Sequence, residues 1–424
     1  MAFTKSAVEE LSALHGEPEW LRARRLESFG IFEGMSLPDT KRQEDWRQVD
    51  LKGLDLDAYA PFQQPNGTAP AAGLGETSGM LLQRGTSTPA VTLDPALANQ
   101  GVLFMPLAQA AKEHRGLVER YLFRSIRGDR DKFAALHAAL FTGGTLLYVP
   151  DGVIVDQPLI SQFWSGAGDA AVLPHSLVIG GKGSRFQYVD EFLSADRQAA
   201  LLVSGSTEVF LDEGANLGYV ALQQWSDRAW QFANQHFQLG RDAQLRMVDV
   251  ALGGRFSRLR VEASLKGAGS SADLRGLFFG TGQQAYDFRT LQDHIGPYTT
   301  SDLLFKGALR DLARSVYVGV VRVEPEARGS SSNQANRNLL LSEKARATSE
   351  PILEILNNDI LRCSHGATVG PVDPEHLFYL ESRGIPRSVA QQMLVQGFLG
   401  EVLDRLPVQQ VRDVVERELA ARVE

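Results

Sequence analysis

The single cysteine of the chain lies two residues from a histidine, in the stretch Arg362-Cys363-Ser364-His365-Gly366. A thiolate and an imidazole are the softest common protein ligands and suit iron or zinc. On a β-strand, Cys363 and His365 share one face and Ser364 points to the other. Two ligands do not complete a tetrahedral site, so a metal held here needs further ligands from another chain or a transient donor. In the alternative and commoner case, Cys363 is a small buried hydrophobe and His365 a hydrogen-bonded structural residue.

Other chemical motifs are weak. The chain has no G-x-x-x-x-G-K-[ST] loop, which argues against ATP hydrolysis by the P-loop route, and no G-x-S-x-G, H-E-x-x-H or C-x-x-C motif. The stretch GGKGS at 180–184 lacks phosphate-loop spacing and indicates a β-turn. His294 follows an aspartate and allows acid–base work, but a structural position before Pro297 is favoured. Arg337 is expected to bind carbonyls or a carboxylate.

The elements that would position Cys363 and His365 are short strands. From about residue 145, β-rich runs alternate with Gly-containing turns, and five segments repeat near every 29 residues, with a polar second and an apolar third position. Alternation of this kind places one set of side chains on a buried face. Stacked coils of a β-solenoid account for the repeat, and a large antiparallel β-sandwich is the alternative. The segments are SRFQYV at 184, ANLGYV at 215, AQLRMV at 243, ADLRGL at 272 and SDLLFK at 301.

The flanking regions have helical periodicity. We predict an N-terminal helical region with a linker over 1–140, a β-solenoid core over 141–372 and a C-terminal helical domain over 373–424. The linker is the Pro- and Gly-rich stretch at 61–79. Asp373 and Pro374 are typical of a helix start. The second C-terminal helix has more apolar residues than one buried stripe needs, which fits either packing on both sides or docking of another protein.

Composition limits the class of protein. The 424 residues include 43 basic and 51 acidic side chains, a net charge of −8, which argues against a nucleic-acid binder. A single cysteine excludes an internal disulfide and favours a reducing compartment. The sequence shows no secretory signal and no apolar run of about 20 residues, so we expect a cytoplasmic protein with no membrane contact.

Several long stretches together resemble the SufB/SufD family of the SUF iron–sulfur cluster assembly system, and its SufD-type branch in particular. The resemblance is densest over about 290–405 and implies a mainly β fold, a right-handed parallel β-helix with helical flanks. The stretches are RQEDWRQVDL, FTGGTLLYVPDGVIVDQPL, DHIGPYTTSDLLFKGAL, RSVYVGVVRVEP, NQANRNLLLSEKARATSEPILEI, RCSHGATVGPVD and LFYLESRGIPRSVAQQMLVQGF.

The resemblance implies a non-enzymatic scaffold subunit. Such a subunit pairs with a SufB-type paralogue, or with a second copy of itself when isolated, and docks a SufC-type ATPase through its C-terminal helices. His365 matches the histidine implicated in the family, and Cys363 matches its neighbour. No cofactor is expected to bind stably, but a transient iron–sulfur cluster or iron ion is expected at the subunit interface. The expected docking residues are Met393, Leu394, Phe398 and Val402.

One departure from the family pattern lies just before the cysteine. The family often has a run resembling A-D-D-V there, whereas this chain has Asn357, Asn358, Asp359 and Ile360. Two other classes of function stay open from the residues alone. One is a β-helix carbohydrate-active enzyme, which would use paired carboxylates or calcium on an exposed sheet face. The other is a purely structural interaction protein in which Cys363 and His365 are inert.

Overall fold

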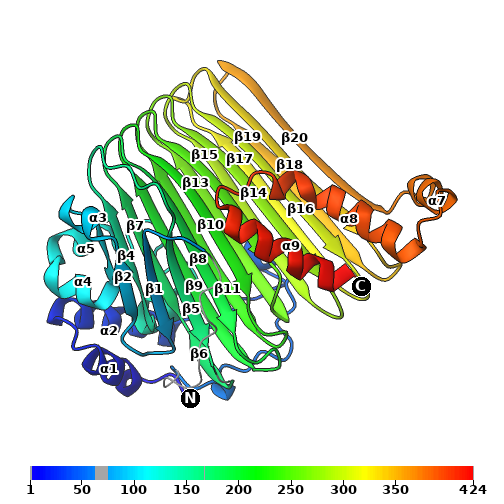
Figure 1. Cartoon of the computed structure of the whole chain (residues 1–424). Helices are drawn as coiled ribbons and strands as arrows, with labels where there is room; N and C mark the ends of the chain where they lie inside the picture. Colours follow the sequence, from blue (N-terminus) through cyan, green and yellow to red (C-terminus); the bar gives the residue numbers. More distant parts are fainter. Residues whose placement is uncertain (1, 63–74, 167, 424) are drawn as a thin grey trace.

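Two large β-sheets face each other and form the body of the molecule (Figure 1). The computed structural model describes residues 2–62, 75–166 and 168–423. One sheet has the order β2 (Ala90–Leu93), β1 (Gly79–Arg84), β5 (Leu159–Ser165), β8 (Arg185–Ser194), β10 (Asn216–Gln224), β12 (Gln244–Ala251), β14 (Ser271–Gly280), β16 (Thr300–Leu309), β18 (Ser330–Leu340) and β20 (Ile360–Pro371). The other has the order β19 (Arg346–Ile355), β17 (Arg314–Val323), β15 (Ala285–His294), β13 (Phe256–Leu265), β11 (Trp230–Leu239), β9 (Leu201–Leu211), β7 (Pro174–Gly180), β4 (Gly143–Val149) and β3 (Leu103–Pro106), with β6 (Ala170–Val172) beside β9.

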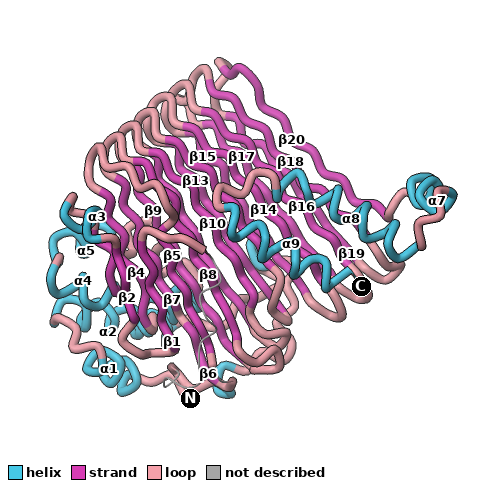
Figure 2. Tube along the Cα trace, in the orientation of Figure 1, coloured by secondary structure: helices cyan, strands magenta, loops and turns pink. Residues whose placement is uncertain are grey.

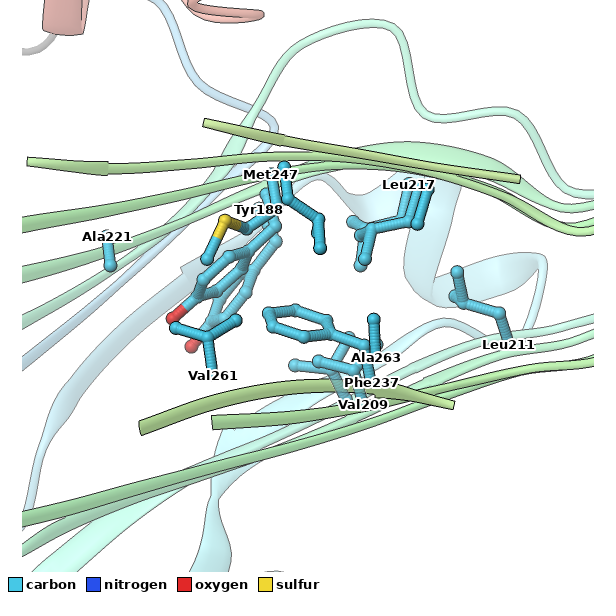
Figure 3. Packing of buried hydrophobic residues seen from close by; sticks show 14 of the residues in the cluster. Tyr188, Val209, Leu211, Leu217, Ala221, Phe237, Met247, Val261 and Ala263 are labelled. Atoms are coloured by element: carbon cyan, nitrogen blue, oxygen red, sulfur yellow. The ribbon is translucent and has the colours of Figure 1, made fainter. Parts of the chain in front are cut away.

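Successive strands from β7 onward alternate between the two sheets, and from β9 onward each pairs in parallel with the strand two places before it. The predicted β-solenoid is therefore confirmed. The antiparallel sandwich is excluded, because the strands of neighbouring coils run parallel to each other. The buried interior is continuous from coil to coil. In Figure 3 the side chains of Tyr188, Leu217 and Met247 project from one sheet toward Val209 and Phe237 of the other.

At one step the sequence repeat predicts the wrong register between neighbouring strands, β12 and β14. The sequence pattern set Ala243 opposite Ala272 and Leu245 opposite Leu274, whereas the structure pairs Leu245 with Ala272 and Met247 with Leu274. That coil is two residues shorter than the pattern suggested. A shift by an even number of residues keeps the same side chains on the inner face, so the predicted core residues Leu245 and Leu274 are buried.

The N-terminal region is helical only in part, which corrects the prediction for 1–140. Three strands, β1 to β3, lie within it and extend the two sheets. The predicted linker falls mostly on residues 63–74, outside the described residues. The helical elements are α1 (Lys5–Leu14), α2 (Glu19–Gly34), the 3-10 turns η1 (Glu44–Trp46) and η2 (Leu56–Ala58), α3 (Pro95–Asn99), α4 (Leu107–Glu113), α5 (Arg115–Tyr121) and α6 (Lys132–Leu140).

The N-terminal helices cover the outer face of one sheet and the C-terminal helices that of the other (Figure 2). The C-terminal helices are α7 (Pro374–Ser382), α8 (Arg387–Leu403) and α9 (Gln409–Val423). Asp373 caps α7 as predicted, because its carboxylate accepts from Glu375 N at 2.8 Å. Helices α8 and α9 lie against the sheet, while α7 projects away from it (Figure 1). Within the described residues, no helix has the length and apolar character needed to span a membrane.

The two ends of the solenoid differ. At the first coil the edge strands β2 and β3 are short, pair in antiparallel and lie beside helices (Figure 1). At the last coil, β19 pairs only with β17 and β20 only with β18 among the described strands. A long edge strand has one row of backbone N–H and C=O groups free to pair with another chain. The end that contains Cys363 and His365 is therefore the open end of the solenoid.

Candidate functional site

Strand β20 positions the predicted ligand pair on the last coil. Its parallel register places Cys363 opposite Ser332 and His365 opposite Gln334 of β18. Ser332 and Gln334 are both buried and face the inside of the solenoid. The predicted strand and its alternation are thus confirmed: Cys363 and His365 share the inward face of the open edge strand.

Cys363 is half-buried at one end of this strand. Its side chain packs with Leu353 and Ile360 against a small apolar cluster that contains Val321 and Val323. Burial in these surroundings raises the pKa of the Cys363 thiol. The thiol is the weak metal ligand and the thiolate the strong one, so Cys363 in the chain alone is a neutral thiol at pH 7.

His365 is exposed, and the structure brings no third ligand to the pair. The described residues contain no group of three or more His, Cys, Asp or Glu side chains arranged to hold a metal ion. Cys363 and His365 alone therefore do not complete a metal site on the open coil. A chain that paired with this edge could supply the remaining ligands.

Ser364 points to the outer face, as its place between the two ligands predicts. Its hydroxyl donates to Asn333 Oδ1 at 2.8 Å, and Asn333 Nδ2 donates to Asp302 Oδ1 at 2.8 Å. Asp302 in turn forms an ion pair with Arg275. This row of side chains runs across four neighbouring strands and holds Ser364 on the outer face of the sheet.

Two residues that the sequence singled out are structural. His294 is fully buried, with Nδ1 2.7 Å from Thr299 Oγ1 and Nε2 2.8 Å from Ser301 Oγ. Burial lowers its pKa to about 4, so the ring is neutral and fully hydrogen-bonded. Arg337 binds a carboxylate as expected, with its guanidinium 3.4 Å from Glu401 of α8.

The four expected docking residues of α8 differ in accessibility. Met393 is 47% exposed, Leu394 and Phe398 are half-buried, and Val402 is 0% exposed. Val402 packs with Val395 and Leu399 against the outer face of the sheet, which corrects its assignment to a docking surface. A helix with apolar residues on most sides does not itself indicate which side faces the sheet.

Sequence reasoning missed two exposed aromatic residues on α7. Phe378 is 72% and Tyr379 57% exposed, and both lie on the helix that projects from the body (Figure 1). The signal was present in the apolar run Leu377-Phe378-Tyr379-Leu380, of which only Leu377 is buried. Val389 and Met393 of α8 are exposed as well, and these four apolar residues on two consecutive helices are here called the α7–α8 surface.

A second apolar surface lies at the open end. Large apolar residues of β19, of the turn that follows it and of β20 are exposed there. Leu361 of β20 is 78% exposed, because a register shift between Ser330 and Ser331 leaves it without a partner on β18. Exposed apolar residues along an open strand edge are typical of a protein–protein interface. The others are Ile352, Ile355, Leu356 and Val369.

Comparison with known proteins matches most of the chain to one family. The model of the SUF system FeS cluster assembly SufBD core domain matches residues 163–398, and that of the SufBD protein N-terminal region matches residues 89–160. The core match covers the solenoid from β5 to α8, including the open end.

Individual relatives agree with this match. The chain is 29% identical to the iron–sulfur cluster assembly protein SufD of Bacillus subtilis over 97% of both chains. It is 34% identical to a SufBD family protein of Mycobacterium tuberculosis over 67% of this chain and 72% of the relative. A SufBD family protein of Staphylococcus saprophyticus is 25% identical over 96% of this chain and 90% of its own length. The chain belongs to the SufB/SufD family of iron–sulfur cluster assembly proteins, and its similarity over full length is to the SufD type.

Proposed function

We propose that the chain is a cytoplasmic scaffold subunit without enzymatic activity of its own, which pairs with a SufB-type paralogue and docks a SufC-type ATPase. In this proposal, Cys363 and His365 contribute to a site at the subunit interface where a cluster or iron ion is held transiently as cargo. The observation that carries the proposal is the position of a soft-ligand pair on the inward face of an open edge strand. A site of this kind becomes complete only when a neighbouring chain covers the edge.

The open end supports pairing with the paralogue. Strands β19 and β20 provide two long free edges, and large apolar side chains are exposed beside them. Addition of strands from a partner would satisfy the free backbone groups and bury these side chains. When the chain is isolated, a second copy could cover the same edges, so we expect pairing with itself to compete with pairing with the paralogue.

The α7–α8 surface supports docking of the ATPase. Its aromatic and Met side chains are of the kinds enriched at interface hot spots. Helix α8 also has a direct connection to the site, because Glu401 contacts Lys306 of β16 at 2.6 Å and Arg337 of β18 at 3.4 Å. Strand β18 is the partner of β20. A shift of α8 driven by the ATPase would therefore reach the strand that holds Cys363 and His365.

Transient metal binding requires only that Cys363 and His365 act as ligands. Cys363 must lose its proton to bind a metal strongly, and the apolar surroundings that raise its pKa oppose this loss in the chain alone. A positive charge supplied at the covered interface would favour the thiolate. His365 needs only a free ring nitrogen. Ligation is thus weak before assembly and stronger after it, which suits transient cargo.

Substitution of His365 tests the proposal. In a reconstituted complex with the SufB-type and SufC-type subunits, His365→Ala should lower the rate of cluster assembly at least 10-fold, and Cys363→Ala should lower it less. Ser364→Ala is the matched control, because its side chain is on the outer face of the same strand. Normal assembly by the His365→Ala, Cys363→Ala double variant would favour a purely structural protein, and polysaccharide cleavage by the isolated chain would favour a carbohydrate-active enzyme.

A further inference from the structure

The strand next to the open strand β20 contains a buried side-chain amide whose oxygen has no hydrogen-bond partner among the described residues. Gln334 of β18 is 0% exposed, and its Nε2 donates to the carbonyl oxygen of Gly319 at 3.0 Å. Its Oε1 is buried and has no hydrogen-bond partner among the described residues. A buried acceptor left unsatisfied is unfavourable by about 1–3 kcal/mol, so an unused oxygen at this place requires an explanation.

The orientation of this amide is fixed by its surroundings. Gly319 leaves room for the Gln334 amide, because a methyl group at position 319 would lie 2.6 Å from Gln334 Nε2 and would overlap the Tyr317 hydroxyl. Since the nitrogen end binds the Gly319 carbonyl, the oxygen must be the free end. The solenoid thus holds a preoriented acceptor inside its last coils.

The strand register identifies the donor that this oxygen can meet. Gln334 pairs directly with His365 of β20, and the two side chains lie on the same, inward face. The inward positions of β20 are Cys363, His365, Ala367 and Val369. Among these residues only histidine has an N–H group in its side chain. A metal-binding histidine usually donates its second ring N–H to a carbonyl or carboxylate oxygen.

We infer that Gln334 is a positioning residue for His365. The two side chains are not hydrogen-bonded in the structure, where the His365 ring is exposed; when the ring turns onto the inward face, Gln334 Oε1 accepts from one ring N–H and leaves the other ring nitrogen free for the cargo metal. The inference deepens the proposed function and rests on it for the metal, but the contact between the amide and the ring needs no second chain, because both residues belong to neighbouring strands of this one. The hydrogen bond selects one imidazole tautomer and one ring orientation. His365 then presents its free nitrogen before the partner subunit arrives.

The same strand contains a matched control. Asn338 lies four residues further along the same face of β18, is 3% exposed, and also has an unpartnered amide oxygen. Its register partner is Val369, which cannot donate a hydrogen bond. Loss of a buried amide at 334 or at 338 should affect folding similarly, but only loss at 334 should affect the His365 ring.

The first experiment observes the ring itself. In the ¹⁵N-histidine-labelled chain, with the His365 signals assigned by their loss in His365→Ala, the two ring nitrogens of the native protein should show one dominant tautomer. Gln334→Met should shift them to the mixture found for a histidine in water, whereas Asn338→Leu should leave them unchanged. Unchanged His365 signals in a folded Gln334→Met chain would overturn the inference.

The second experiment separates the acceptor from the donor end of Gln334. Gln334→Glu keeps an acceptor but loses the donor to Gly319, so it should retain the rate of cluster assembly within about threefold in the reconstituted complex. Gln334→Met should lower that rate about 10-fold, the lower end of the effect expected for a partner of a metal-ligating histidine. Equal losses in the two variants would assign Gln334 a structural role only and overturn the inference.

Failure of the inference and failure of the proposed function give different results. If His365→Ala assembles clusters normally while Gln334→Met still changes the ring signals, the proposed metal site is wrong and the ring contact stands. If His365→Ala blocks assembly but Gln334→Met changes neither ring nor rate, the metal site stands and the assignment of Gln334 is wrong.

Discussion

Gly276 of β14 lies directly opposite Phe305 of β16, and the Phe305 ring occupies the space that a side chain at position 276 would need. Two residues further along, the glycine and the ring exchange strands: Phe278 of β14 fills the space beside Gly307 of β16. Adjacent coils thus interlock through two large rings and two glycines. The fifth position of the sequence repeat is apolar and large in the other four segments, whereas at Gly276 its place in the core is filled by Phe305 from the next coil.

Gly276→Ala should therefore destabilise the chain. A methyl group there overlaps the Phe305 ring, and forced overpacking of a core typically lowers the free energy of unfolding by about 1–3 kcal/mol. Gly205→Ala is the control, because a methyl group at 205 meets no heavy atom closer than 3.9 Å, and a substitution without strain is neutral or stabilising by about 0.4–1 kcal/mol. Urea denaturation measures both, and equal midpoints for the two variants would contradict the interlocking.

Asp249, inside the solenoid on β12, should make stability depend on pH. One carboxylate oxygen accepts from Gln235 Nε2 at 2.9 Å, and the other has no partner among the described residues. Burial raises the pKa of Asp249 from 3.8 to about 7, and the nearby carboxylate of Asp190 contributes. A carboxyl group whose pKa is higher in the folded chain gives stability that is present below about pH 4 and is lost as the pH rises through about 7.

Asp249→Asn removes this dependence while keeping the shape of the side chain. The free energy of unfolding of the variant, minus that of the native chain at the same pH, should increase between pH 4 and pH 8 by a few kcal/mol, at about 1.4 kcal/mol per pH unit. Comparison at each pH cancels the contributions of titrating groups that do not interact with Asp249. The exposed Asp156→Asn is the control, and a difference that stays flat with pH would show that Asp249 titrates normally.

Much of the fold follows from local pattern. Alternation with a period of two fixed the inner face of each strand, and an even shift in register left that face unchanged, so the solenoid core was predictable despite a misaligned coil. The strand with Cys363 and His365 was predictable for the same reason. Strands β1 to β3 were missed because they are short and lie among helices, and only pairing with β5 and β4 identifies them.

Relations between distant segments were not predictable from pattern. The burial of Val402 depends on the outward-facing residues Leu277 and Phe279 of β14, which belong to the same apolar cluster. The pairing of Gln334 with His365 depends on register across a whole coil. Neither relation leaves a periodic signal, because each is set by how two separate elements meet in space.

Trp46 should be essential to the attachment of the N-terminal segment. Its ring lies 5.6 Å from that of Phe133 and 6.2 Å from that of Phe232 of β11, and the Arg258 guanidinium lies 4.1 Å above it. Asp45 beside it forms an ion pair with Arg258 at 3.2 Å. This contact holds η1 against the outer face of the sheet, next to the N-terminal helices.

Trp46→Ala should lower the free energy of unfolding by about 3–5 kcal/mol, the usual effect of deleting a buried aromatic ring. Trp46→Phe keeps a ring and should lose less than half as much. Guanidinium denaturation gives the energies, and limited proteolysis should cut the alanine variant first within the N-terminal segment. A Trp46→Ala chain with native stability and native cleavage would show that the segment is held by other contacts.

Met393 and Val402 lie on the same helix, but a charge introduced at Met393 should affect binding of a partner, whereas a charge at Val402 should affect folding. Met393 belongs to the exposed α7–α8 surface, so Met393→Asp should change stability by no more than about 0.5 kcal/mol and, if this surface docks the ATPase, should weaken its binding at least 10-fold. Val402 is fully buried against the sheet, so Val402→Asp should unfold the C-terminal helices, because an unpaired buried charge is strongly unfavourable.

Gln396→Asp provides the matched control for Met393→Asp, because Gln396 is exposed on α8 close to Met393 and the substitution adds the same charge without removing an apolar side chain. Binding of the purified ATPase subunit, followed by calorimetry, should be weakened by Met393→Asp and changed less than threefold by Gln396→Asp. Equal weakening by both would point to charge repulsion instead of an apolar contact. Native affinity in both would place the docking surface elsewhere, with the exposed Phe378 and Tyr379 of α7 as the next residues to substitute.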